Sequence, residues 1–425
     1  MLSLIKSLCA SFIIVLAVLI PASGQMVMPQ NAEPEVTYIH AGRLIAIPGE
    51  DVKTEQTIII SGAGISEIRD GYATPPQGAA TINLKNMTVL PGLIDSHTHL
   101  LTEYGPAAFF KSLTQNQVEF AFDGVVNARK TLMAGFTTVQ DLGGGDEAIF
   151  ALRDAIAAGK TPGPRVLASG RQIRAVAEDK NYNSAVGCAG ADECRRITRQ
   201  QIIAGADVIK VTLSGGEPLS SLTPPIVFFD EELEAIVETA KTMERKVTCH
   251  AMSPDKIKQC LRAGVHSIEH GSYMDDEAAK LAKKTGATFV PTLVIGPVME
   301  SAAVNFGLPQ PIAEAFSTAM LDAVKIAKKR NVPIALGSDS GPSKHGENAN
   351  ELLRLVEAGL SPEEAIRAAT VTSARHLGLE ARIGAIEVGK SADIIAVDGD
   401  PLEDIAELLT VDFVMKAGVV YKKAE

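Results

Sequence analysis

Two histidines one residue apart, His97 and His99, end the apolar stretch LPGLIDSHTHL at residues 90–100. In a β-strand, side chains two residues apart point to the same face, so both imidazoles can be directed at one point. Such a pair can hold a divalent cation. Zinc usually takes three or four ligands, however, and a lone HxH pair arises by chance in many chains. The pair therefore predicts a metal site only if the rest of the chain supplies further ligands.

Further residues with metal-binding or metal-bridging groups follow apolar runs elsewhere: Lys210 in VIKVTL, His250 in KVTCHA, His270 in SIEHG and Asp339 in GSDSG. His270 could also be a satisfied core histidine, and Asp339 a turn or capping residue. Lys210 is harder to explain in this way, because an unpaired lysine in an apolar strand is costly to bury. A lysine amine can accept carbon dioxide and become a carbamate, whose two oxygens suit the bridging of two metals.

The elements that must position these residues follow one repeated pattern from about residue 89. A short apolar run leads through a polar loop into an amphipathic segment that ends in glycine, where a helix can stop in a left-handed turn. The apolar runs are TVLPGLIDSH, FTTVQDL, RVLASGR, DVIKVTL, KVTCHA, HSIEHG, TFVPTLVI and PIALGSD. This alternation predicts a (β/α)8 TIM barrel over residues 89–379, with a doubly wound open sheet as the alternative. No GxGxxG opens a helix after the first strand, which favours the barrel.

The barrel prediction gives the candidate ligands a common position, because active sites of such barrels lie at the C-terminal ends of the strands. The residues that end predicted strands are His97 and His99 on the first, Lys210 on the fourth, His250 on the fifth, His270 on the sixth and Asp339 on the eighth. All would face one mouth. The sequence therefore predicts a metal site there.

The flanks of the chain do not follow this alternation. Residues 36–70 and 383–421 contain short alternating runs separated by glycine and proline turns, which is typical of strands. We expect both ends of the chain to meet in a small β-sandwich domain beside the barrel, built from residues 25–88 and 380–425.

The N-terminus predicts export. Lys6 precedes the apolar run FIIVLAVLI, and Ala22 and Gly24 have the small-residue spacing that a signal peptidase recognises. The run is too short to span a bilayer, so residues 1–24 are predicted to be a cleaved signal peptide and Gln25 the first residue of a periplasmic or secreted protein. An uncleaved anchor is the alternative; after cleavage we expect no stable membrane association. The net charge of -11 argues against nucleic acid as a partner.

Export would place the cysteines of the mature chain in an oxidising compartment. Cys188 and Cys194 lie close together in the loop-like stretch GCAGADEC, where a local disulfide is sterically plausible. Cys249 and Cys260 are expected to be separate small buried hydrophobes. No cysteine or histidine spacing suggests a structural zinc.

The chain resembles the amidohydrolase superfamily over nearly all of its predicted mature length. The resemblance rests on PGLIDSHTHL, SIEHGSYMDDE, GSDSGPSKHGEN and the closing RIGAIEVGKSADIIAVDGDPL. These stretches look most like the group of dipeptidases and N-acyl amino acid hydrolases once labelled prolidases, which also resembles imidazolonepropionase.

The resemblance implies two divalent metal ions per chain, expected to be zinc. Matched residue by residue, His97 and His99 with Asp339 would hold one ion, His250 and His270 the other, and Lys210, carboxylated on its side-chain nitrogen, would bridge them with a hydroxide. That hydroxide would attack the amide carbonyl of a dipeptide or N-acyl amino acid. Asp339 would take the proton and return it to the leaving amine.

Such a small-molecule substrate carries a carboxylate, and Arg171 and Arg174 are its predicted partners, because an arginine fork binds carboxylates bidentately. Solvated loop charges are the alternative for both. His345 matches an HGxN stretch of the group and is expected to support the site or contact substrate. Relatives often carry TGGH where this chain reads RQIRAVAEDK, and many have tyrosine where Phe229 stands, so the substrate preference stays open.

Two other functions compete with this prediction. A cyclic-imidazolone hydrolase or deaminase of the same superfamily typically uses one metal and lacks the strand-four lysine, so Lys210 counts against it. An exported binding protein with an inactive site would normally have lost at least one ligand. A homo-oligomer is compatible with either.

Overall fold

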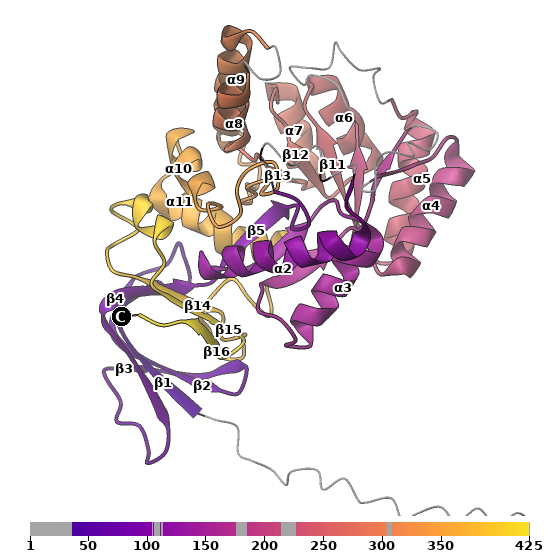
Figure 1. Ribbon diagram of the computed structural model, residues 1–425. Coiled ribbons are helices and arrows are strands. Elements are labelled where there is room, and N and C mark those ends of the chain that lie inside the picture. The colour runs from indigo at the N-terminus through magenta and orange to yellow at the C-terminus, as the bar shows by residue number, and fades with distance from the viewer. Residues whose placement is uncertain are drawn as a thin grey trace, which may run out of the picture.

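The computed structural model describes residues 36–103, 105, 111, 114–175, 185–213, 227–303 and 308–424. The predicted signal peptide and the predicted mature start at Gln25 lie outside the described residues. Figure 1 shows a sheet that contains the first and last described strands, beside a larger part in which strands and helices alternate. Within the described ranges, no helix has the length and apolar character needed to cross a membrane.

The first part is one seven-stranded sheet with the order β16-β15-β14-β4-β1-β2-β3. Its strands are β1 (Val36–Leu44), β2 (Lys53–Ser61), β3 (Gly64–Asp70), β4 (Ala80–Pro91), β14 (Ile394–Val397), β15 (Phe413–Lys416) and β16 (Val419–Lys422). β4 pairs in parallel with β1 on one side and antiparallel with β14 on the other. The flanks of the chain therefore meet, but the described strands form one continuous sheet in place of the separate sheets of the predicted sandwich.

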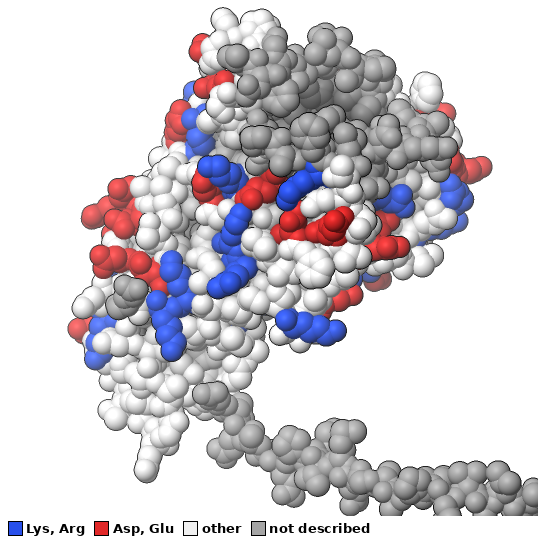
Figure 2. Space-filling model, in the orientation of Figure 1, with Lys and Arg blue, Asp and Glu red and all other residues white. Residues whose placement is uncertain are grey.

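Apolar side chains from both ends of this sheet share one buried cluster, in which Ile39 and Ile58 meet Ile394 and Phe413. Burying each such side chain contributes about 1.5–3 kcal/mol. Basic and acidic side chains are interspersed over the face drawn in Figure 2. Exposed ion pairs contribute little to stability, so the apolar cluster holds the sheet together.

The second part contains two parallel sheets, with the orders β5-β6-β7 and β13-β12-β11-β10-β8-β9. Their strands are β5 (Leu93–Thr98), β6 (Phe136–Asp141), β7 (Arg165–Ala168), β8 (Gln172–Arg174), β9 (Ala185–Gly187), β10 (Val208–Thr212), β11 (Lys246–Ala251), β12 (Ser267–His270) and β13 (Thr288–Val290). Every pairing within these two sheets is parallel.

Backbone hydrogen bonds join the edges of these sheets, partly through the segment 333–340. The bonds, each 2.8 Å long, run from Asp207 N to Ala168 O between the β10 and β7 regions, from Phe289 N to Pro333 O, and from Ser96 N to Leu336 O. The segment thus lies between β13 and β5. This succession of parallel strands is consistent with the predicted TIM-barrel-like fold.

Helices follow the strands as the glycine pattern predicts. They are α2 (Gln117–Met133), α3 (Asp146–Ala157), α4 (Ala191–Ala204), α5 (Asp230–Thr242), α6 (Pro254–Ala263), α7 (Asp276–Thr285), α8 (Ile295–Ala302), α9 (Gln310–Lys329), α10 (Asn350–Glu357), α11 (Pro362–Arg367) and α12 (Ser373–Leu377). Gly264 and Gly286 end α6 and α7 in the left-handed conformation, with φ of +88° and +75°. Short π and 3-10 segments follow at Ala368–Thr372 and Ile405–Leu409.

The structure contains two disulfides among the described residues. Cys188 and Cys194 are joined, with their Cα atoms 5.1 Å apart, at the start of α4. Cys249 and Cys260 are also joined, with Cα atoms 6.4 Å apart. The expectation that the second pair are separate hydrophobes is therefore wrong, because α6 packs its buried face on β11 and brings two residues eleven apart into contact.

A histidine pair, with one ring buried and the other half-buried, lies at the N-terminal ends of the parallel strands. His376 on α12 stacks on His266, with ring centroids 5.1 Å apart and planes within 14° of parallel. His266 directly precedes β12. Burial and the neighbouring His266 lower the pKa of His376 to about 3, so its imidazole is neutral in the folded protein.

The free energy of unfolding should therefore decrease as the pH is lowered. An unfolded histidine binds a proton near pH 6.5 and the folded one does not until about pH 3, so His376 should remove about 2 kcal/mol of unfolding free energy between pH 7 and pH 5. His376→Phe keeps a ring against His266 but cannot titrate. In urea titrations at the two pH values, its loss should be smaller than that of wild type by this amount. Equal pH dependence in the two proteins would contradict a neutral buried His376.

Candidate metal centre

The structure places the predicted ligands at or near the carboxyl ends of the parallel strands, except Lys210, which is the middle residue of β10. They are His97 on β5 and His99 directly after it, Lys210 on β10, His250 on β11, His270 at the end of β12 and Asp339 in the segment 333–340. β10 has the sequence VIKVT and is buried at every residue. Its lysine therefore enters the interior together with the apolar side chains that form the strand.

Asp339 is the residue on which the imidazoles converge. Its Oδ1 lies 3.2 Å from His99 Nε2 and 3.6 Å from His97 Nε2, and its Oδ2 lies 4.0 Å from His270 Nδ1. Ligand atoms of His97, His270 and Asp339 all fall within 4.8 Å of one another, as a metal site requires. The ring centroid of His250 lies 4.4 Å from that of His270. The fold therefore brings these five residues together.

Lys210 contributes a buried amine with no hydrogen-bond partner among the described residues. Burial lowers the pKa of Lys210 to about 8, although the nearby Glu269 and Asp339 act to raise it. An amine buried without a partner is costly, so its position suits a group that completes the site. Imidazoles, a carboxylate and such an amine together fit divalent metal ions that take nitrogen and oxygen ligands.

The electrostatics of the cluster keep Asp339 ionised. Burial alone would raise the pKa of Asp339, but His97, His99 and Lys210 outweigh burial and lower it to about 2. His270 behaves in the opposite way, because burial and the neighbouring imidazoles hold its pKa well below the usual value. Near neutral pH the site therefore presents an anionic carboxylate and a neutral imidazole, which are the protonation states that metal binding requires.

Two of the ligands stand on strained backbone. His270 and Asp339 have φ of +66° and +50°, in the left-handed region that residues other than glycine rarely adopt. Thr292 Oγ1 lies 2.8 Å from His270 Nδ1 and also donates to Pro291 O at 2.8 Å. The threonine hydroxyl therefore accepts from Nδ1, which leaves Nε2 of His270 unprotonated. Such strain costs about 1–3 kcal/mol per residue and is typical of functional sites.

Glu269 is a site residue that sequence reasoning missed. Its Oε2 lies 2.8 Å from His97 Nδ1, and its Oε1 accepts hydrogen bonds from Ser267 at 2.8 Å and from Thr248. Strict alternation along β12 would put Glu269 and His270 on opposite faces. The left-handed backbone at His270 ends the alternation, so both side chains reach the interior. A carboxylate on Nδ1 fixes the tautomer of a metal-binding histidine.

Asp95 is a second carboxylate that the sequence did not single out. It is fully buried and accepts hydrogen bonds from Asn348 Nδ2 at 2.8 Å and from the backbone nitrogens of Ser338 and His97 at 3.0 Å and 3.1 Å. Burial raises the pKa of Asp95 to about 6 despite these bonds. Asp95 therefore ties β5 to the loop that carries Asp339. In the sequence, the feature that could have identified Asp95 as a site residue was its position two residues before His97.

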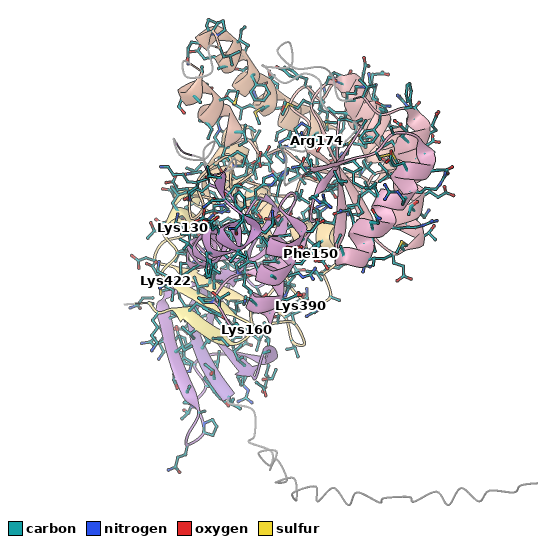
Figure 3. The ribbon with its side chains drawn as sticks, turned by 45° about the vertical axis from the view of Figure 1, so that its right-hand side comes forward. Lys130, Phe150, Lys160, Arg174, Lys390 and Lys422 are labelled. Atoms are coloured by element: carbon teal, nitrogen blue, oxygen red, sulfur yellow. A yellow bond between two sulfur atoms is a disulfide. The ribbon has the colours of Figure 1, made fainter. Side chains whose placement is uncertain are left out.

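The predicted substrate residues have different surroundings. Arg171 Nε donates to Asp146 Oδ2 at 2.9 Å, and Arg171 N donates to Asp146 Oδ1 at 2.8 Å, so this guanidinium is held in an ion pair. That one of the two arginines binds the substrate carboxylate stays a prediction. Arg174 ends β8 and lies opposite Thr212 of β10. Figure 3 shows Arg174 at the ends of the strands, far from Lys390 and Lys422 of the sheet part.

His345 and Phe229 are further residues that the sequence analysis considered. His345 Nε2 bonds to Thr102 O at 2.8 Å, and its Nδ1 lies 3.4 Å from Thr131 Oγ1, so the ring anchors the loop after β5. Its role in supporting the site or contacting substrate stays a prediction. Phe229 directly precedes α5 and is 67% exposed.

Residues 88–421 match the model of the amidohydrolase family. The chain is similar to ochratoxinase of Aspergillus niger, with 31% identity over 439 residues that cover 93% of this chain and 89% of that protein. It is similar in structure to a Xaa-Pro dipeptidase with methionine bound in the active site, with a TM-score of 0.83 and 36% identity over 91% of this chain and 100% of that one. A prolidase complexed with N-methylphosphonate-L-proline gives a TM-score of 0.82 and 28% identity, again over 91% and 100%.

Glu269→Gln should weaken metal affinity by about ten- to a hundredfold, because Nδ1 of His97 loses the carboxylate that orients its ring. Metal retained against graded chelator concentrations, read by mass spectrometry, measures this. Glu232→Gln is the matched control, since Glu232 is a buried carboxylate that accepts hydrogen bonds from Gly190 N and Phe229 N. Equal metal retention in both variants would show that Glu269 does not orient the ligand.

Proposed function

The chain belongs to the amidohydrolase family, and from that premise we propose that it is a metal-dependent hydrolase that cleaves the amide bond of dipeptides or N-acyl amino acids. The family membership confirms the resemblance seen in the sequence. The observation that carries the proposal is the convergence of imidazoles and Asp339 beside the partnerless buried amine of Lys210. A binding protein without activity would have no need to keep that amine buried.

We assign the ligands as the resemblance implies. His97, His99 and Asp339 would hold one divalent ion, His250 and His270 a second, and carboxylated Lys210 would bridge them. Bound divalent ions, with zinc the expected metal, would lower the pKa of a water and polarise the amide carbonyl. Segment 333–340 would supply the eighth strand of a closed barrel, which its bonds to both neighbouring strands support.

Carboxylation of Lys210 is favoured by its own surroundings. A neutral amine is the form that attacks carbon dioxide, and the pKa of about 8 leaves a substantial neutral fraction near pH 8. Bond formation between the amine nitrogen and the carbon of carbon dioxide releases one proton and produces a carbamate anion. The cation that is costly to bury thereby becomes an anionic ligand.

Asp339 would transfer the proton during hydrolysis. It is ionised near neutral pH and within reach of the imidazole ligands, so its carboxylate can accept the proton of an attacking water. When the carbon–nitrogen bond breaks, the same carboxylate returns that proton to the leaving amine. An ester needs no such protonation of its leaving group, so weaker esterase activity is expected.

The dipeptidase and prolidase relatives support a substrate whose leaving half is an amino acid with a free carboxylate. We assign Arg174 as the partner of that carboxylate, because it ends β8 at the mouth. We also propose that the chain is exported, which the sequence of residues 1–24 supports. N-terminal sequencing of secreted protein would then begin at Gln25.

Lys210→Ala should bind fewer than two metal ions and lose most amide hydrolysis, because the bridging anion is gone. Added formate or acetate should restore part of the activity by occupying the space of the carbamate. Metal content by mass spectrometry and turnover of a panel of Xaa-Pro dipeptides and N-acyl amino acids measure both effects. Lys416→Ala, at a buried lysine of β15, should keep the activity and not respond to formate. Full activity in Lys210→Ala, or one ion in fully loaded wild type, would contradict the binuclear assignment.

Arg174→Ala should lower kcat/KM by about ten- to a hundredfold for substrates with a free carboxylate, the size of a charge-assisted hydrogen bond. The matching carboxamides should be cleaved alike by variant and wild type. Arg171→Ala is the control and should discriminate between acid and amide as wild type does. If wild type cleaves acid and amide equally well, carboxylate recognition is wrong even where the metal chemistry holds.

A further inference from the structure

Gln172, the first residue of β8, carries an amide whose nitrogen makes no hydrogen bond among the described residues. Its side chain is neither buried nor fully exposed. In the register of β8 with β10, Ile173 lies opposite Val211 and Arg174 opposite Thr212, so Gln172 stands level with Lys210. Paired parallel strands present residues at one level to the same face. Gln172 therefore faces the interior that Lys210 enters.

Thr212 fixes which way this amide points. Its Oγ1 donates a hydrogen bond to Gln172 Oε1 at 2.7 Å. Thr212 is itself buried, so its hydroxyl has little freedom to turn elsewhere. With the carbonyl end held by Thr212, the two N–H groups of the amide point away from β10.

Gly143 shows where the amide nitrogen lies. A Cβ atom on this glycine would stand 2.5 Å from Gln172 Nε2 and 3.0 Å from Cε1 of His99. The amide nitrogen and the imidazole thus rest against the same glycine, and no larger residue fits between them. The carbonyl of Gly143 also bonds His99 Nδ1 at 3.0 Å, which anchors the ring on that side. Two N–H donors therefore stand beside a metal ligand, with no protein acceptor among the described residues.

We propose that Gln172 is a specificity-determining residue that donates a hydrogen bond to the carboxylate of the substrate's amino acid half, with Thr212 as its positioning residue. The inference rests on the proposed function and deepens it. Arg174 lies two residues further along the same strand face, so the amide and the guanidinium offer one carboxylate donors from two positions. Gln172 supplies the inner position and Arg174 the outer one.

The chemistry of the substrate requires an inner donor. In a dipeptide, the carboxylate carbon lies only about 2.5 Å from the nitrogen of the scissile bond, across one Cα atom. A carboxylate this close to the reacting amide must bind within the mouth, near His99 and Asp339. An uncharged amide can donate there without adding a further charge to the mouth. A site of this kind also rejects substrates in which the carboxylate is missing, because the donors would be left unpaired.

Binding of N-methylphosphonate-L-proline and of its carboxamide to the metal-loaded full chain tests the inference without requiring turnover. Calorimetry should show that Gln172→Leu weakens binding of the acid by about ten- to a hundredfold and changes binding of the carboxamide by less than about threefold. Thr212→Val should weaken binding of the acid severalfold, since it removes only the group that orients the amide. Gln200→Leu, at an exposed glutamine of α4, is the matched control and should bind both probes as wild type does.

The outcomes separate this inference from the proposed function. Wild type that cleaves dipeptides while Gln172→Leu binds the acid normally would overturn the role of Gln172 and leave the hydrolase intact. Equal weakening of acid and carboxamide would also overturn it, because Gln172 would then contact another part of the ligand. Failure of wild type to cleave the dipeptide panel counts against the proposed function. Failure of wild type to bind the acid counts against the carboxylate site.

Discussion

Burial of a lysine amine among imidazoles, away from water, is the constraint on which the rest of this structure depends. A cation without a partner in such a place would cost several kcal/mol, and so would a lone carboxylate. Two carboxylates lie on either side of the His97 ring: Glu269 contacts Nδ1, and Asp339 contacts Nε2. Carboxylates therefore lie near the amine, while burial still lowers the pKa of Lys210 to about 8.

The scaffold around the cluster holds these groups in place. Asp95 accepts hydrogen bonds from the backbone nitrogens of both His97 and Ser338. Asp95 therefore holds β5 and the loop that carries Asp339 together. Left-handed backbone at His270 and Asp339 turns both side chains toward the centre, and such strain persists only where neighbouring contacts enforce it. Ligands held in this way need little rearrangement when a metal or substrate binds, which is the condition for electrostatic catalysis.

The proposed function requires the mouth to recognise a substrate as well as to activate water. The candidate metal ligands come from different strands and the segment 333–340, whereas the proposed carboxylate donors come from β8 alone. The seven-stranded sheet lies at the other side of the fold. It contacts the parallel-strand part through, for example, the 2.7 Å ion pair between Arg165 of β7 and the buried Asp393. Specificity can therefore change on β8, in the stretch where this chain lacks TGGH, without altering the candidate metal ligands.

The sequence by itself determined the alternation of strands and helices, the junction of the two flanks and the residues that gather in the candidate metal centre, because each depends on local periodicity or on the rule that sites lie at strand ends. Only the tertiary structure showed that Glu269 supports His97, that Cys249 meets Cys260, and that Arg171 is paired with Asp146. Each of these contacts joins residues from different elements. Their distances follow from how strands are registered and helices are packed, and the spacing of residues along a chain does not contain that information.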